Sequence, residues 1–119
     1  MGYHHSQYQA DGQDHRGWFI GSFMENPAAR TDVVEIKYTE FPVGPTEHGL
    51  KTSGTFECSI MVSGKARAII GDDEKIWQAG DFIAIEPGTP NNLVLEILEP
   101  VQIFTVKAPC DPTAKKVIG

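Results

Sequence analysis

The chain has 119 residues, of which 40% are hydrophobic and 22% charged, and its formal net charge is −6. That length and composition predict one soluble domain with one core. The ten Lys and Arg residues are scattered along an acidic chain, which excludes the basic stripe of a nucleic-acid binder and disfavours binding to an anionic membrane.

The segment 1–13 is polar and lacks the apolar stretch of a secretory signal, so we expect a cytoplasmic protein. The two cysteines, Cys58 and Cys110, form no Cys-x-x-Cys motif, which excludes zinc-ribbon and thioredoxin chemistry. We expect a polar N-terminal arm at 1–16, a single β-barrel domain at 17–107 and an extended C-terminal tail at 108–119.

Short apolar runs, some alternating with period two and broken by Gly, Pro, Asn and Asp, predict strands along the whole chain. In chain order the predicted strands are 17–24, 33–39, 55–62, 66–70, 75–78, 81–85, 93–98 and 101–107. Turns are predicted at 63–65 and 71–73, and loops at 41–49 and 86–92. About eight short strands at this spacing are typical of an all-β sandwich, jelly roll or small barrel.

Two of these strands place chemically distinct side chains on their two faces. In 33–39, Val34, Ile36 and Tyr38 share one face, and Glu35 and Lys37 share the other. In 55–62, alternation puts three polar or long side chains on one face and three apolar ones on the other, in the order Glu57, Ser59, Met61 and Cys58, Ile60, Val62. A wholly apolar second face requires cover, either from the chain's own terminal strand or from a partner subunit.

Two segments together resemble the cupin superfamily. Glu57 is followed by six residues and then Gly64, with Gly44 at a fitting distance upstream, as in the first cupin motif. A Gly-Asp pair, an apolar strand and a Pro-Gly turn then follow over 80–91 at the spacing of the second motif. The resemblance implies a cupin-type jelly-roll β-barrel or sandwich of about eight or more short antiparallel strands, and such small cupins commonly form homodimers.

The chain departs from the family at the positions where cupins hold a metal. The two histidines of the first motif fall on Lys51 and Ser53, and a register longer by one residue also contains no histidine. The third histidine falls on Asn91, so only the carboxylate, Glu57, is kept. Transition-metal sites of this type need imidazole nitrogens beside the carboxylate.

We therefore expect no cofactor, and a divalent metal is disfavoured; if one is bound, its ligands are His48, Glu57 and Asn91. A buried carboxylate without a metal needs another partner. We hypothesise that the Lys51 ammonium replaces the metal charge and pairs with Glu57. Asn91 either binds a ligand or satisfies the backbone of its own loop.

The first functional hypothesis is a binding module that holds an unidentified small polar ligand, sugar-like or carboxylate-like, in the barrel without a metal. The ligand-binding candidates are Lys51, Ser53, Glu57, Ser59, Met61 and Asn91. The second is a cupin enzyme, either metal-dependent with displaced ligands or a metal-free sugar isomerase or epimerase, for which no catalytic residue is assigned. The third is a structural or regulatory dimeric partner protein. We expect a homodimer, and no nucleic-acid or membrane partner.

Overall fold

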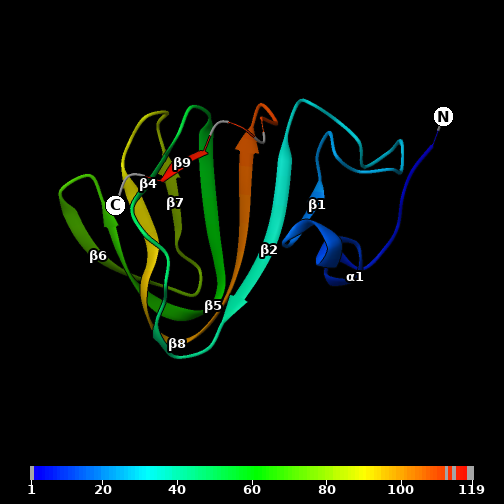
Figure 1. Ribbon diagram of the computed structural model, residues 1–119. Coiled ribbons are helices and arrows are strands. Elements are labelled where there is room, and N and C mark those ends of the chain that lie inside the picture. Colours follow the sequence, from blue (N-terminus) through cyan, green and yellow to red (C-terminus); the bar gives the residue numbers. More distant parts are fainter. Residues whose placement is uncertain (1, 112, 114, 118–119) are drawn as a thin grey trace.

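The computed structural model describes residues 2–111, 113 and 115–117. Within these residues, nine strands join into one continuous antiparallel sheet that curls over on itself (Figure 1), so the predicted all-β class is confirmed. The elements are α1 (Tyr8–Gly12), η1 (Gln13–His15), β1 (Trp18–Ile20), β2 (Glu35–Phe41), β3 (Gly44–Pro45), β4 (Lys51–Ser53), β5 (Phe56–Ile70), β6 (Asp73–Gln78), β7 (Phe82–Ile85), β8 (Asn91–Ala108) and β9 (Lys115–Val117). Among the described helices, none is long and apolar enough to cross a membrane.

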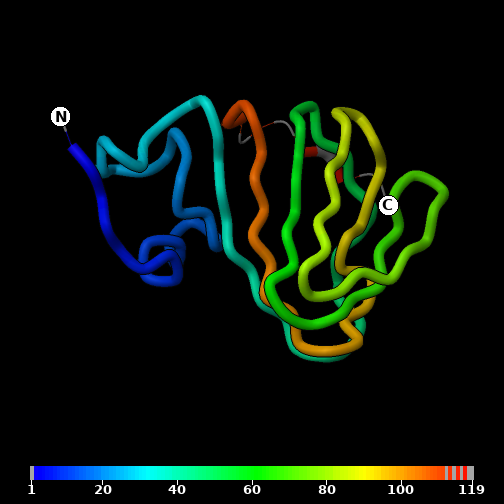
Figure 2. Tube along the Cα trace, turned by 180° about the vertical axis from the view of Figure 1, so that it is seen from behind, coloured from blue at the N-terminus to red at the C-terminus, as the bar shows by residue number. Residues whose placement is uncertain are grey.

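Two long strands, β5 and β8, organise the molecule because each belongs to both layers of the sandwich. They pair with each other from Phe56–Ala108 to Ile70–Asn91. One layer contains β7, the first half of β5, the second half of β8, β2 and β1. The other contains β6, the second half of β5 and the first half of β8, with β3, β4 and β9. Figures 1 and 2 show the two strands curving from one layer into the other.

The predicted breaks within these two strands are wrong. The sequence predicted separate strands on either side of a turn at 63–65, whereas β5 runs through this segment with register shifts against β8. Gly64 has a φ of 97°, and a Cβ added there would lie 2.1 Å from the carbonyl oxygen of Pro100. The glycine therefore marks a bulge where two backbones approach closely and both strands bend, and not a hairpin turn.

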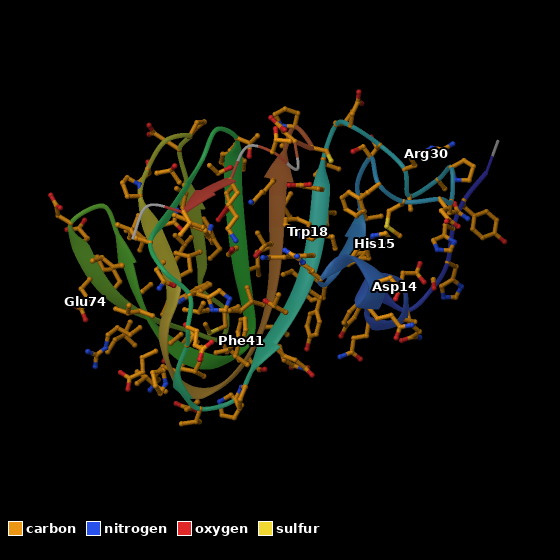
Figure 3. The ribbon with its side chains drawn as sticks, in the orientation of Figure 1. Asp14, His15, Trp18, Arg30, Phe41 and Glu74 are labelled. Atoms are coloured by element: carbon orange, nitrogen blue, oxygen red, sulfur yellow. The ribbon has the colours of Figure 1, made fainter. Side chains whose placement is uncertain are left out.

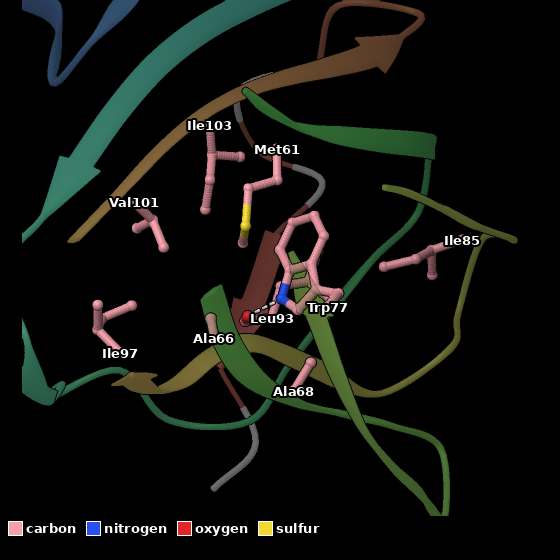
Figure 4. Packing of buried hydrophobic residues seen from close by; sticks show 9 residues of the cluster. All are labelled: Met61, Ala66, Ala68, Trp77, Ile85, Leu93, Ile97, Val101 and Ile103. Atoms are coloured by element: carbon pink, nitrogen blue, oxygen red, sulfur yellow. Dashed lines mark hydrogen bonds between the residues drawn. The ribbon is translucent and has the colours of Figure 1, made fainter. Parts of the chain in front are cut away.

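The apolar core lies between the two layers and contains nine buried residues (Figure 4): Met61, Ala66, Ala68, Trp77, Ile85, Leu93, Ile97, Val101 and Ile103. Trp77 is its largest member, and its indole N–H donates to the carbonyl oxygen of Leu93 at 2.9 Å. The hydrogen bond satisfies the one polar group that the indole brings into the core.

The N-terminal segment extends the sheet sideways. Only Trp18–Ile20 of the predicted strand 17–24 is regular, and it pairs with the outer edge of β2. Helix α1, which the sequence did not predict, packs against β1 and β2, and the Tyr8 ring lies 4.5 Å from the Tyr38 ring and 5.1 Å from the Phe104 ring. The apolar face of β2 therefore points outward beneath α1, and Lys37 points into the sandwich.

The apolar face of β5 is not covered by the N-terminal strand, so this predicted alternative is wrong. Ile60 is 42% exposed and Val62 53% exposed, and Cys58 on the same face is half-buried. The view from behind in Figure 2 shows that no described segment crosses this part of the sheet. The reason is the pairing of β1 with the edge of β2, which carries the N-terminal segment away from β5.

We predict that Gly64→Ala destabilises the fold far more than Gly71→Ala. Both glycines have positive φ, but a Cβ at Gly71 meets no atom within 4 Å. Gly71→Ala should lower the free energy of unfolding by about 1 kcal/mol through backbone strain alone. Gly64→Ala should add roughly 2 kcal/mol because the two strands must separate. Urea unfolding of the two variants measures this difference, and equal losses would refute the close-approach argument.

Candidate functional site

The inner face of the first layer carries a row of three buried ionisable side chains. Glu57 on β5 lies directly opposite Lys107 on β8, and Lys107 lies opposite Glu35 on β2. Their exposed fractions are 3%, 6% and 4%, respectively. Charged groups are rarely buried to this extent unless they are paired, so the row requires an explanation from its contacts.

The next rows along the same strands become progressively less polar. Ser59 lies opposite Thr105, which lies opposite Lys37, and the two hydroxyl oxygens are 2.9 Å apart. One step further, Met61 lies opposite Ile103, and both belong to the apolar core. The interior is thus apolar on the side of β6 and ionic at the opposite end.

The buried carboxylate of Glu57 is held between two ammonium groups. Lys51 Nζ on β4 donates to Oε2 at 3.1 Å and to Oε1 at 3.3 Å, which confirms the predicted pair. Lys107 Nζ lies 3.6 Å from Oε1. The Lys51 side chain is 22% exposed, so the pair has one end toward solvent and one end fully enclosed. Both carboxylate oxygens are therefore neutralised by cations of the chain itself.

Lys37 is the third cation of this cluster, and it lies against an aromatic ring. Its Nζ is 5.0 Å from the centroid of the Trp18 ring, and Lys107 Nζ is 5.5 Å from the same centroid, both within cation–π range. Trp18 projects from β1 beside β2, and Phe41 marks the far end of β2 (Figure 3). We call Lys37, Lys51, Lys107 and Glu57 the lysine cluster.

Lys37 has no carboxylate within 4.0 Å and no hydrogen-bond acceptor among the described residues. Burial lowers its pKa to about 8, with further lowering from the ammonium groups of Lys107, Lys51 and Lys115, while Glu57 acts in the opposite direction. Burial also lowers the pKa of Lys107, and Glu57 partly offsets this. The positive charge of the cluster is therefore held at a cost in free energy.

The charges at this end of the sandwich do not balance. Three lysines face two buried carboxylates, Glu57 and Glu35. Glu35 has no cation within 4.0 Å among the described residues, and its Oε2 accepts a hydrogen bond of 3.4 Å from Cys110 Sγ. One ammonium charge is left without a close partner among the described residues, and an excess of positive charge in a poorly solvated place favours binding of an anion.

Asn91 stands opposite Lys51 in the register of β4 and β8 and is 1% exposed. Its amide nitrogen donates to the carbonyl oxygen of Thr89 at 3.0 Å, so the side chain does satisfy its own loop. Its Oδ1, however, is buried and has no hydrogen-bond partner among the described residues. A buried acceptor of this kind beside the cluster is able to accept a hydrogen bond from a donor such as a ligand hydroxyl.

The other predicted ligand-binding residues are engaged within the protein. The hydroxyl oxygens of Ser53 and Thr55 are 2.9 Å apart, and that of Ser59 is used by Thr105. Met61 lies in the apolar core at 1% exposure, which separates it from the polar group with which it was predicted. Lys51, Glu57 and Asn91 are the predicted residues that the structure brings together.

The residues present do not fit a cupin-type metal. Both Glu57 oxygens face ammonium groups, which repel a cation. The predicted alternative ligand His48 is exposed and packs its ring 5.2 Å from the Phe41 ring. Its pKa is lowered by partial burial and by Lys115, Lys37 and Lys51. Within the described part of the chain, no three His, Cys, Asp or Glu side chains converge as metal ligands do.

Lys37, Lys107 and Trp18 were missed by the sequence reasoning. For Lys107 a signal existed, because it continues the alternation of Val101, Ile103 and Thr105 along one strand. All four side chains are buried, so the alternation that marks the core residues of this strand also indicated that Lys107 points inward. For Lys37 and Trp18 there was no comparable signal, because the inward direction depends on α1 covering the opposite face of β2.

No protein-family model and no curated protein sequence matches this chain. Several solved structures, however, are similar to it. A conserved double-stranded β-helix protein from Klebsiella pneumoniae has a TM-score of 0.64 and 20% identity, covering 75% of this chain and 77% of its own. A cupin protein from Bacteroides fragilis has a TM-score of 0.60 and 18% identity, covering 69% and 70%. The nucleoside dehydratase Pac13 from Streptomyces has a TM-score of 0.60 and 14% identity, covering 74% and 70%.

These likenesses confirm the predicted fold. The chain has the cupin, or double-stranded β-helix, fold, with the jelly-roll architecture that the two sequence segments implied. The neighbours are described variously as a conserved protein and as an enzyme, and at such low identity the fold carries no single activity.

We predict that Lys37 makes the stability of the protein depend on pH in the alkaline range. In the unfolded chain its pKa is near the ordinary 10.5, against about 8 in the folded state. Between these values the unfolded state holds a proton that the folded state has released, so the free energy of unfolding rises with pH. Lys37→Met should therefore stabilise the protein at pH 7 by on the order of 2 kcal/mol, allowing for partial solvent screening, and this gain should vanish toward pH 10.5.

Urea unfolding at several pH values tests this, with Lys75→Met, on exposed β6, as the matched control. The control should follow the wild-type curve. Parallel curves for Lys37→Met and the wild type would contradict the assigned pKa.

Proposed function

We propose that the protein binds a small, anionic, oxygen-rich molecule, such as a carboxylic acid or an acidic sugar, at the lysine cluster and without a metal. The observation that carries the proposal is the Lys37 ammonium, which has no close carboxylate among the described residues, near Glu57, a carboxylate that two other lysines already neutralise. A carboxylate bound there would restore charge balance in a poorly solvated place.

Two neighbouring groups support the same ligand class. The Oδ1 atom of Asn91 has no partner among the described residues and would accept a hydrogen bond from a ligand hydroxyl. The Trp18 ring, close to two of the lysines, offers a flat apolar wall on one side. A molecule with a carboxylate, a hydroxyl and an apolar face matches these three features, and the site sits in the kind of barrel interior where ligands bind.

The enzyme alternatives receive less support. A metal-free isomerase or epimerase requires a free base, but the Glu57 carboxylate is bound by Lys51 and Lys107. A metal-dependent enzyme requires ligands that these ammonium groups would repel. The cytoplasmic location expected from the sequence stays a prediction.

We predict that glucuronate binds and that glucose, its neutral counterpart, does not. Binding should change the fluorescence of Trp18, which can be followed in titrations at physiological salt. Lys51→Met and Lys107→Met should each weaken binding at least about ten-fold, because each removes a charged hydrogen-bond donor. Lys75→Met should have no effect, and Trp18→Phe should remove the signal. Equal binding of both sugars, or unchanged binding in the two cluster variants, would overturn the proposal.

We also propose that the protein is a homodimer that pairs through the exposed face of β5 and β7. By register, Phe82 and Ile60 lie side by side there, and Ala84 and Cys58 form the next row. The exposed fractions are 68% for Phe82 and 42% for Ile60. Uncharged centres with charged rims are typical of interfaces, and a chain of net charge −6 can meet its own copy only where repulsion is weak.

We expect the wild-type chain to be dimeric and Ile60→Glu to be monomeric, because the substitution would bury two carboxylates in the interface. Light scattering after size-exclusion chromatography at micromolar concentration measures this. Val43→Glu is the control, because Val43 is also strongly exposed, at 60%, but lies in the loop between β2 and β3. A monomeric wild type would refute the dimer.

A further inference from the structure

The surroundings of the Lys37 amine resemble those of lysines that act as nucleophiles. Its Nζ lies against the Trp18 ring, on the inner wall of the sandwich, and no described carboxylate or hydrogen-bond acceptor holds it. Lysine becomes a nucleophile when desolvation and a neighbouring cation favour its neutral form. Both conditions hold, because Lys37 is half-buried and Lys107 approaches the same ring.

The charged surroundings of Lys37 come from five strands. Glu35 precedes it by two residues on the same face of β2, Lys107 lies on β8, and Lys51 and Lys115 lie on β4 and β9. The three lysines lower its pKa and only Glu57, on β5, raises it appreciably, so that burial and cations together bring it to about 8. A minor fraction of the side chain, about a tenth, is therefore the free amine at pH 7, far more than for a lysine with the ordinary pKa.

We propose that Lys37 is a carbonyl-reactive amine that forms a Schiff base with a keto acid or aldehyde acid whose carboxylate is bound by Lys51 and Lys107. This rests on the anion site proposed above and narrows its ligand to carboxylates that carry a carbonyl group. The Nζ lone pair attacks the carbonyl carbon, both Nζ protons pass to the carbonyl oxygen, and that oxygen leaves as water. The product is an imine, and no oxidant or reductant is consumed.

The protein's residues have distinct roles in this step. Lys51 and Lys107 position the carboxylate and, as cations, lower the pKa of Lys37. Glu57 holds these two lysines in place through its contacts of 3.1 Å and 3.6 Å. Lys51 and Lys107 are positioning residues, and Lys37 is the catalytic residue because it alone bonds to the ligand.

The first test measures the amine itself and needs no specific ligand. The intact protein is treated briefly with formaldehyde and cyanoborohydride at a series of pH values, and the methylation of each lysine is read by peptide mass spectrometry. We expect half-maximal labelling of Lys37 near pH 8, against about 10.5 for an ordinary lysine. Lys107→Met should move the Lys37 midpoint upward by roughly one pH unit. A Lys37 midpoint near the ordinary value would overturn the inference.

The second test traps the imine with borohydride. Pyruvate should leave on Lys37 an adduct with the mass of pyruvic acid less one oxygen atom, and acetone, which lacks the carboxylate, should give at least ten-fold less. Lys37→Arg should abolish the adduct while keeping the charge, and Lys51→Met should reduce pyruvate trapping by a larger factor than it reduces formaldehyde labelling of Lys37 at the same pH, because Lys51 also lowers the pKa of Lys37.

The two tests separate the inference from the function on which it rests. Equal trapping of pyruvate and acetone, with labelling near pH 8, would leave Lys37 a reactive amine but refute the anion site. Pyruvate could instead compete with glucuronate, so that glucuronate no longer changes the Trp18 fluorescence, and yet give no borohydride adduct. That result would leave the anion site intact and refute the Schiff base.

Discussion

The burial of one carboxylate, Glu57, sets the arrangement of the whole ionic end of the sandwich. A charge at 3% exposure is tolerated only with close partners of opposite sign. These come from β4 through Lys51 and from β8 through Lys107, so one side chain of β5 links strands of both layers. Removing Glu57 would leave the buried Lys107 without a carboxylate within 4.0 Å among the described residues, whereas removing either lysine would leave Glu57 with one cation instead of two.

Strands β5 and β8 carry residues of both the apolar core and the ionic end of the interior. Along β5 and β8 the facing pairs change from Met61–Ile103 through Ser59–Thr105 to Glu57–Lys107. The first pair belongs to a core that is dense and apolar, which supplies the stability of the fold. Because that core carries the stability, the opposite end can hold unbalanced charges that reduce it, as is common for functional sites.

The fold and half of the site could be predicted from the sequence, for identifiable reasons. Strand alternation and motif spacing predicted that Glu57 points into the barrel and that Lys51 lies beside it. Both predictions depend only on residues that are close together in the sequence. The continuity of β5 through Gly64 could not be predicted, because glycine signals a bulge and a turn equally well and the deciding contact, with Pro100, is distant in sequence. The inward direction of Lys37 could not be predicted for a related reason, since it depends on α1 covering the opposite face of β2.

A lysine such as Lys51, in place of the histidine that the motif resemblance would put there, changes what such an interior can do. A metal offers open coordination positions and Lewis acidity, whereas an ammonium offers a fixed positive charge and hydrogen-bond donors. Several lysines in one enclosed place have a second effect, because each disfavours the protonation of the others and burial adds to this. Lys37, which has no close carboxylate among the described residues, has its pKa lowered to about 8 and so supplies free amine at a lower pH than an ordinary lysine. Electrostatic recognition and amine chemistry thus have one cause, namely three ammonium groups around two buried carboxylates.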